Sequence, residues 1–192
     1  MTDKTVGFAL CGSFCTYTKA MKALEDVTGE FTTVIPIFSE VSQNTDSRFG
    51  PAALHIQRAE ALCGREILRT IADVEPIGPK KLLDALVIAP CTGNTLAKLA
   101  HGIADGPVTM AAKSHLRNGR PVILAVSTND GLAAAAENIG RLLRAKHFYF
   151  VPFRQDTPGQ KPTSLVADFD QIVPTVQAAL KGEQIQPVIL GP

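Results

Sequence analysis

The stretch from Asp84 to Asp105 reads DALVIAPCTGNTLAKLAHGIAD and combines an apolar segment, a hydroxyl-rich turn and the start of a helix. Its first part, residues 85–89, is apolar at every position, which is typical of a parallel strand covered on both faces. Pro90 has no N–H to donate to a neighbouring strand, so we expect the strand to end there. The stretch therefore predicts an α/β fold built on a doubly wound parallel sheet.

A helix is expected to follow this strand. Thr92, Asn94 and Thr95 offer hydroxyl and amide groups, and from Leu96 onward apolar residues recur at helical spacing. A helix that begins just past a strand's carboxyl end points unpaired backbone N–H groups at the crevice where α/β proteins bind ligands. The turn therefore suits an anion such as a phosphate, with simple capping of the helix by Thr92 or Asn94 as the alternative.

Two earlier turns carry similar groups. A short apolar strand near the amino terminus is followed by Gly12, which permits close backbone approach, and by Ser13, which offers a hydroxyl. Residues 31–38 are rich in β-branched and aromatic residues and predict a second strand, after which Ser39 follows. In a parallel sheet these turns share one edge. The full GxGxxG fingerprint is absent, which argues against a dinucleotide site.

The rest of the chain alternates apolar strand segments with helical patterns and fits a single domain over residues 1–192, with 182–192 as a C-terminal tail. Residues 43–50 are polar and predict a rim loop, and residues 147–153 predict a last strand. Residues 154–167 contain two prolines and a glycine, so we expect an irregular loop there.

Composition excludes several classes of protein. Hydrophobic residues make up 45% and charged residues 19%, as in an ordinary soluble protein, and 19 basic against 18 acidic residues leave no basic field for a nucleic acid. The amino terminus lacks the long apolar region of a signal peptide, and no apolar run approaches membrane-spanning length, so we expect a cytoplasmic protein with no membrane partner. The four cysteines and four histidines show no metal-ligand or disulfide spacing, so no metal site is expected.

Residues 90–105 resemble the signature of a flavin-binding family that includes the cysteine decarboxylases of peptide and coenzyme A biosynthesis and the flavin prenyltransferases. The family carries Pro-Ala/Cys-Ser/Thr-x-Asn/Lys-Thr and then a helix ending in Asn-Gly-Ile/Leu-Ala/Ser-Asp, where this chain has His101 in place of the Asn. The resemblance implies a flavodoxin-like, Rossmann-like three-layer sandwich that binds flavin mononucleotide (FMN). The cofactor-binding residues that it implies are Gly12, Ser13, Phe14, Ser39, Pro90, Cys91, Thr92, Asn94, Thr95, Thr109, Ser127 and Thr128.

Two departures restrict the chemistry that the resemblance implies. The cysteine decarboxylases carry a catalytic His-Ile pair eight residues before the Asp that opens the third strand, and this chain has Pro76 and Ile77 there. A proline cannot exchange protons, so the decarboxylase acid/base group is missing. The prenyltransferases carry a phosphate-binding Arg where this chain has Ser127, and of the decarboxylases' Pro-x-Met-Asn only Asn129 is kept. No catalytic residue can be assigned from the sequence.

The missing histidine and the loop from Phe150 to Ala167 narrow the resemblance to a branch of the family found in spore-forming bacteria. That branch implies an oxidoreductase subunit that acts with a second, different subunit, which brings the nicotinamide cofactor NAD(P), on a small dicarboxylate. The implied substrate-binding residues are Asn129, Arg154 and Lys161, and Arg48 offers one more cation. The family also implies a homo-trimer or homo-dodecamer.

Two alternatives stay open. One is a flavin-dependent cysteine decarboxylase that has relocated its catalytic group. The other is a non-catalytic subunit that binds flavin or regulates its partner through the same fold. The visible spectrum of the purified protein, measured with and without FMN, shows whether the chain binds flavin; a chain that binds none would be a regulatory subunit.

Overall fold

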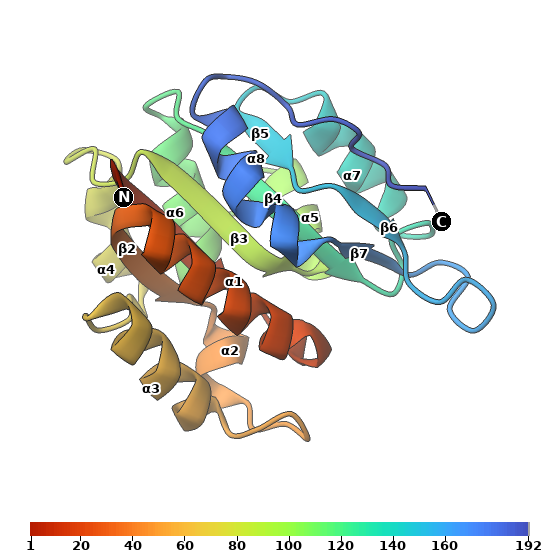
Figure 1. Ribbon diagram of the computed structural model, residues 1–192, viewed down its shortest axis with the longest axis horizontal. Coiled ribbons are helices and arrows are strands. Elements are labelled where there is room, and N and C mark those ends of the chain that lie inside the picture. The colour runs from red at the N-terminus through yellow and green to blue at the C-terminus, as the bar shows by residue number, and fades with distance from the viewer. Residues whose placement is uncertain (192) are drawn as a thin grey trace.

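The computed structural model describes residues 1–191, and a seven-stranded sheet runs through its centre (Figure 1). Five strands are parallel and stand in the order 2-1-3-4-5. They are β1 (Thr2–Leu10), β2 (Phe31–Phe38), β3 (Ala85–Cys91), β4 (Val122–Thr128) and β5 (Phe148–Phe150). This is the flavodoxin-like order, in which the direction of winding reverses between β1 and β3, and it places a ligand crevice at their carboxyl ends.

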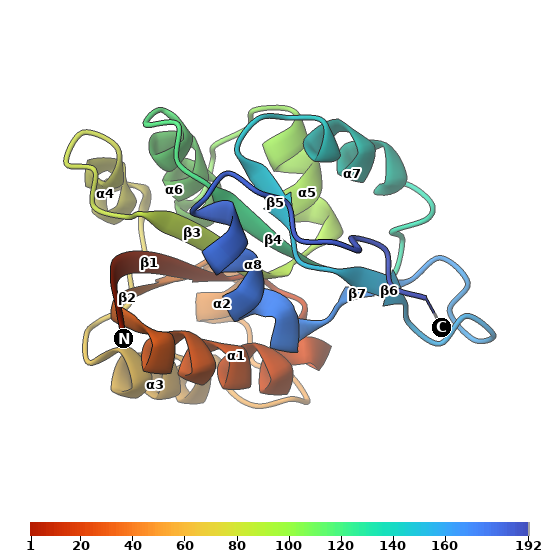
Figure 2. The same ribbon diagram turned by 45° about the horizontal axis from the view of Figure 1, so that its top comes forward.

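Helices cover both faces of the sheet, as Figure 2 shows. On one face α1 (Tyr17–Glu30) and α8 (Ile172–Ala179) pack against each other, and α3 (Ala52–Cys63) packs on α1 and β2. The other face carries α5 (Gly93–Ala100), α6 (Pro107–Leu116) and α7 (Ala136–Leu143). Short helices α2 (Glu40–Asn44) and α4 (Ile71–Val74) lie in the connections. The predicted doubly wound, three-layer fold is confirmed.

The central strands are apolar because both of their faces are covered. Every residue of β3 is buried, and so are the first six of the seven residues of β4. On the α1 side the helix residues Tyr17, Met21 and Leu24 are buried, and aromatic residues such as Phe8 complete the core. The continuous apolar run of residues 85–89 is thus explained by burial on two sides.

The prediction that Pro90 ends its strand was wrong, because β3 continues to Cys91. Pairing with β1 stops at Ile88, whereas pairing with β4 shifts its register after Ile88 and resumes between Cys91 and Val126. A residue in a parallel sheet bonds to one neighbour at a time, so the missing N–H of Pro90 interrupts the ladder without ending the strand on both sides.

Two other segments are more regular than predicted. The predicted loop 154–167 contains the ends of a hairpin, β6 (Phe153–Gln155) and β7 (Leu165–Ala167), whose strands are antiparallel, and β7 pairs with Ser127 and Thr128 of β4. The prolines and the glycine of this segment all lie between the two strands, so they leave the pairing intact. The predicted single strand 147–153 is therefore split, and the predicted rim loop 43–50 begins within α2.

The C-terminal segment runs along the molecule's own sheet. Phe153 N donates to Val188 O at 2.9 Å, and Leu190 N donates to Phe153 O at 2.9 Å. Residues 188–190 of the predicted tail therefore lie beside β6, and the tail's last residue lies outside the described part of the chain.

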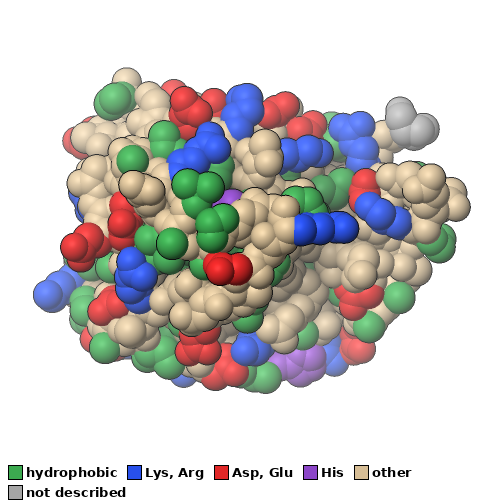
Figure 3. Space-filling view, turned by 90° about the horizontal axis from the view of Figure 1, so that it is seen from below, with side chains coloured by type: hydrophobic (Ala, Val, Ile, Leu, Met, Phe, Trp, Pro, Cys, Tyr) green, Lys and Arg blue, Asp and Glu red, His purple; other side chains and the backbone are tan. Residues whose placement is uncertain are grey.

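The described residues show no membrane-spanning helix and no cluster of metal ligands, and the face seen in Figure 3 is not dominated by one sign of charge. None of the helices in residues 1–191 is long and apolar enough to cross a membrane. The four cysteines are free, and the described residues contain no group of three or more His, Cys, Asp or Glu side chains placed to hold a metal ion. Seen from below, basic, acidic and hydrophobic side chains are interspersed and no sign of charge dominates (Figure 3).

Candidate functional site

The turns that follow β1, β2, β3 and β4 meet at the carboxyl edge of the sheet and line two hollows. The first hollow has a volume of about 330 Å³ and the second of about 520 Å³. Gly12 and Thr92 line both, so the two hollows adjoin. A Cβ on Gly12 would lie 2.9 Å from Val41 Cγ1, so a side chain there would crowd this boundary. The crevice that the fold predicts is therefore present.

The first hollow is lined by hydroxyl groups that cap helices. Thr92 Oγ1 accepts from Thr95 N at 3.2 Å at the start of α5, and Ser39 Oγ accepts from Ser42 N at 3.2 Å at the start of α2. The capping alternative is therefore confirmed for Thr92, whose side chain also lines the hollow. The predicted residues that line this hollow are Gly12, Ser39, Thr92, Asn94, Thr95 and Thr109.

The first hollow is lined by one cation and two carboxylates. Lys98 Nζ lies 2.9 Å from both carboxylate oxygens of Asp105, and this hydrogen-bonded cation lowers the pKa of that carboxyl. Glu40 also lines the hollow. An anion would therefore be held mainly by neutral hydroxyls and by the backbone N–H groups of the α5 start, with Lys98 available once it leaves Asp105.

The second hollow is bordered by a chain of hydroxyls. Ser13 Oγ lies 3.0 Å from Ser127 Oγ, Ser127 donates to Thr16 Oγ1 at 3.4 Å, and Thr16 donates to the Ser13 carbonyl at 2.8 Å. This series of hydrogen bonds ends on the Ser13 carbonyl, which can only accept. Each hydroxyl in the series therefore donates to the next, from Ser13 to Ser127 and from Ser127 to Thr16. The predicted residues that line this hollow are Gly12, Ser13, Phe14, Thr92, Ser127, Thr128, Asn129 and Lys161.

Two cations reach the second hollow from separate loops. Arg48 comes from the segment after α2 and lies over the Phe49 ring, with 4.9 Å from its guanidinium carbon to the ring centroid. Lys161 comes from the β6–β7 connection and pairs with Asp156 at 2.8 Å, which raises the pKa of the lysine. Both side chains are exposed enough to change partner when a ligand enters.

Three of the predicted site residues are not brought to the hollows. Arg154 lies on β6, where it pairs with Asp168 at 3.6 Å and lines a different hollow beside Lys19. Pro90 and Cys91 are buried at the end of β3, and burial raises the pKa of the Cys91 thiol. Neither residue lines the first or the second hollow.

Cys11 is a buried residue of the first hollow that the sequence did not single out. It comes directly before Gly12, and burial raises the pKa of its thiol to about 11. The thiol is therefore protonated at neutral pH and contributes an apolar wall to the hollow.

Asp130 and Gly93, which lie against the predicted residue Thr128, were also missed. Thr128 Oγ1 donates a short hydrogen bond to the Asp130 carboxylate. A Cβ on Gly93, the first residue of α5, would lie 2.8 Å from Thr128 Oγ1 and 2.9 Å from Asp130 Oδ1. The sequence shows a threonine and an aspartate two residues apart after a buried strand, so this pair could have been predicted. The position of Gly93 against the pair could not, because Gly93 is far from it along the chain.

The position that carries histidine in the decarboxylases lies away from both hollows. Pro76 belongs to a 3-10 turn (Glu75–Ile77) that packs against α6. Neither Pro76 nor a neighbour in this turn lines the first or the second hollow.

Known proteins resemble this chain over nearly its whole length. The model of the family described as "Flavoprotein" matches residues 1–181. The chain is 43% identical to the B subunit of dipicolinate synthase from Bacillus subtilis (strain 168) over 190 residues, which cover 99% of this chain and 95% of that protein. The crystal structure of the same subunit from Bacillus halodurans C matches with a TM-score of 0.90 and 42% identity, covering 98% of this chain and 96% of the other.

A more distant structure shares the fold. A dodecameric FMN-dependent Ubix-like decarboxylase from Escherichia coli O157:H7 matches with a TM-score of 0.61 and 20% identity, covering 77% of this chain and 79% of that one. The match of the family model over nearly the whole chain, together with the close relative, establishes the assignment. The chain belongs to the flavoprotein family.

Proposed function

We propose that this chain is the FMN-binding subunit of a dipicolinate synthase. With a second subunit, the A subunit of dipicolinate synthase, it would oxidise dihydrodipicolinate to dipicolinate with NAD(P) during sporulation. The observation that carries the proposal is the pair of adjoining hollows at the carboxyl edge, in a chain 43% identical to a protein named as the B subunit of that enzyme. That name itself implies a partner subunit.

The residues of the two hollows fit a flavin. The first hollow offers the phosphate the start of α5 and the hydroxyls of Ser39, Thr92 and Thr95. The second hollow has room for a flat ring beside Phe14 and is reached past Gly12, which has no side chain to block the way. A bound flavin supplies a hydride acceptor. Pro90 and Cys91 would support this turn from behind, without side-chain contact to the cofactor.

The substrate's two carboxylates need donors, and the second hollow offers two. Arg48 and Lys161 approach it from different loops, and Lys161 would exchange Asp156 for a substrate carboxylate. Asn129, which also lines the hollow, adds an amide donor. Arg154 would have to leave Asp168 to take the substrate role that the sequence predicts for it.

Assembly and the nicotinamide site belong to the proposal as well. Fold likeness to a dodecameric relative supports a homo-trimer or homo-dodecamer. Since the chain lacks the GxGxxG fingerprint of a dinucleotide site, NAD(P) is assigned to the A subunit. The protein is expected to work in the cytoplasm.

The test is to purify the chain, titrate it with FMN and assay dihydrodipicolinate oxidation with NAD(P), with and without the A subunit. We expect FMN binding by the chain alone, little turnover, and full turnover after the partner is added. Full activity of the chain alone would refute the dependence on a partner.

Other results would favour the alternatives. Release of carbon dioxide from cysteine-terminated peptides would make the chain a decarboxylase. If no FMN binds, a non-catalytic, regulatory role becomes the better account.

A further inference from the structure

Arg48 differs from the other cations predicted to bind the ligand. Lys161 Nζ lies 2.8 Å from an Asp156 oxygen, and an Arg154 nitrogen lies 3.6 Å from an oxygen of Asp168. Within the described part of the chain Arg48 forms no ion pair, and none of its guanidinium nitrogens donates a hydrogen bond. Its N–H donors therefore remain available to a ligand, whereas the other two cations must first give up a carboxylate.

An aromatic ring holds the guanidinium of Arg48. The guanidinium carbon lies over the Phe49 ring, 4.9 Å from its centroid. A contact with the face of a ring uses the charge of the planar guanidinium and leaves its N–H donors unused. Phe49 is 43% exposed and lines the second hollow, so it is not a residue of the core. Orienting Arg48 at the hollow gives this exposed ring a task.

Arg48 and Phe49 stand at the tip of a tight turn. Ser47 and Gly50 pair as an antiparallel bridge, with N to O distances of 3.1 and 3.0 Å, which leaves two residues between them. Gly50 has a φ of +124°, which side chains rarely adopt, so the turn depends on glycine there. Ser47 Oγ also accepts from Phe49 N at 3.1 Å. These bonds fix the direction in which the two tip residues leave the backbone.

Contacts with two helices hold the base of this turn. Asp46 Oδ1 accepts from Ala52 N at 2.9 Å, at the start of α3. His55 of α3 packs against the turn, since a Cβ on Gly50 would lie 3.1 Å from His55 Nε2. The His55 ring in turn packs edge-on against the Tyr17 ring of α1, with 4.8 Å between centroids. The tip of the turn therefore approaches the second hollow from a fixed base.

We infer that Arg48 is the anchor for one carboxylate of the substrate in the second hollow and that Phe49 is its positioning residue. This inference rests on the substrate class of the proposed function. The guanidinium offers a carboxylate two parallel N–H donors. Phe49 holds the plane of the guanidinium before the ligand arrives, so less side-chain entropy is lost when these bonds form. Lys161 takes the second carboxylate after it leaves Asp156.

A binding experiment tests both residues without any turnover. Isothermal titration calorimetry with pyridine-2,6-dicarboxylate measures the affinity of each variant, with and without added FMN. Arg48→Lys keeps the charge but loses the two parallel donors, so binding should weaken about tenfold. Phe49→Leu loses the ring face and should weaken binding about fivefold, whereas Phe49→Tyr keeps the face and should bind as the wild type does. Arg65→Lys, a matched change at an exposed arginine outside both hollows, should leave the affinity unchanged.

A double-mutant cycle separates positioning from direct contact of the ring with the ligand. In an Arg48→Gln background, Phe49→Leu should cause no further loss of affinity, because no guanidinium is left to orient. A further fivefold loss in that background would show that the Phe49 ring touches the ligand itself and would refute the positioning role. All variants should keep the thermal unfolding temperature of the wild type, because both side chains are exposed.

The outcomes separate this inference from the proposed function. If FMN binds but the wild type and Arg48→Lys bind the dicarboxylate equally, the anchor is refuted while flavin binding stands. If no FMN binds but the losses in Arg48→Lys and Phe49→Leu are found, the inference stands and the flavin part of the proposed function fails. If the wild type binds no dicarboxylate, the substrate class of the proposed function is wrong and this inference is refuted with it.

Discussion

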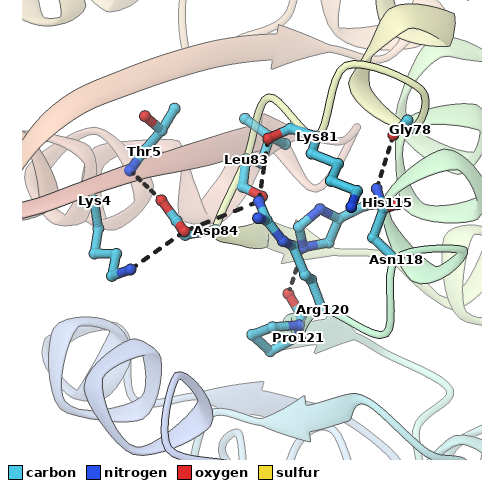
Figure 4. Close-up of polar contacts among 10 residues, drawn as sticks. All are labelled: Lys4, Thr5, Gly78, Lys81, Leu83, Asp84, His115, Asn118, Arg120 and Pro121. Atoms are coloured by element: carbon cyan, nitrogen blue, oxygen red, sulfur yellow. Dashed lines mark hydrogen bonds and ion pairs between the residues drawn. The ribbon is translucent and has the colours of Figure 1, made fainter.

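The two edges of the central sheet are built from the same strands but differ in chemistry. At the amino edge, charged side chains close on one another and on backbone groups (Figure 4). Asp84 accepts from Thr5 N at 2.9 Å and lies 3.4 Å from Lys4 Nζ and 3.9 Å from an Arg120 nitrogen. Arg120 also donates to two backbone carbonyls just before β3. The charged groups of this cluster are paired, and the edge presents none of the residues of the two hollows.

At the carboxyl edge the surface is hollowed, and beside charged residues such as Lys98 and Lys161 it is lined by short hydroxyl side chains. Their hydrogen bonds are mostly to one another or to helix N–H groups, as between Ser13 and Ser127 or at Thr92. Such groups can turn toward a ligand at small cost because no buried charge is left unpaired. The amino edge therefore stabilises the fold while the carboxyl edge remains available for binding, and changes at each edge test this division.

The largest effect is expected at the amino edge in acid. His115 is fully buried, its Nε2 lies 3.1 Å from Pro121 O, and its Nδ1 has no partner in residues 1–191. Burial, aided by Arg120, lowers the His115 pKa to about 4, against opposing effects of the Pro121 hydrogen bond and Asp84. Because the unfolded chain binds this proton near pH 6.5, stability falls as the pH drops from 6.5 to 4, by about 3 kcal/mol.

Urea unfolding of the wild type and of His115→Gln at pH 7, 5.5 and 4 measures this contribution. The variant should lose less stability than the wild type between pH 7 and pH 4, and the exposed control His101→Gln should behave as the wild type. Equal losses in all three proteins would show that His115 is not the acid-sensitive group.

A smaller loss is expected when the Asp84 cluster is opened. Asp84→Ala leaves Thr5 N–H and the Arg120 guanidinium without their acceptor, which should cost about 2 kcal/mol of unfolding free energy. FMN affinity should not change, because Asp84 is at the opposite edge. The control Asp26→Ala removes an exposed ion pair with Lys22 and should cost less than about 0.5 kcal/mol. Weakened FMN binding in Asp84→Ala would contradict the division between the edges.

The smallest effect is expected for single hydroxyls of the carboxyl edge. Ser39 caps α2 and faces the first hollow, whereas Thr70 caps α4 elsewhere in the molecule. Either change to alanine should cost about 1 kcal/mol of stability. Only Ser39→Ala should also weaken FMN binding, by about tenfold, because it removes a phosphate donor. Equal FMN affinity of the two variants in a fluorescence titration would remove Ser39 from the site.

The sequence predicted the parts of the molecule that depend on local pattern. The strand 31–38 matches β2, and the apolar run 85–89 lies within β3, because burial of both faces is visible residue by residue. The short β6 and β7 were missed because strands of three residues have no period to detect.

The edge that carries the candidate site could be predicted, because the carboxyl ends of parallel strands meet at one edge of the sheet. The turns carrying Ser13, Ser39 and Thr92 were expected at one edge, where they lie. The direction of the Arg154 side chain could not be predicted, because it depends on the pairing of β6 with β7 and on the position of Asp168. The contact between Gly93 and Asp130 likewise joins two separate connections, and spacing along the chain does not show it.

The most direct test of flavin binding at the carboxyl edge is the visible absorption spectrum of the purified chain during titration with FMN. We expect saturable binding of one FMN per chain, with a shifted flavin spectrum that Asp84→Ala preserves and Ser39→Ala weakens. A spectrum identical to that of free FMN at every protein concentration would contradict this central claim.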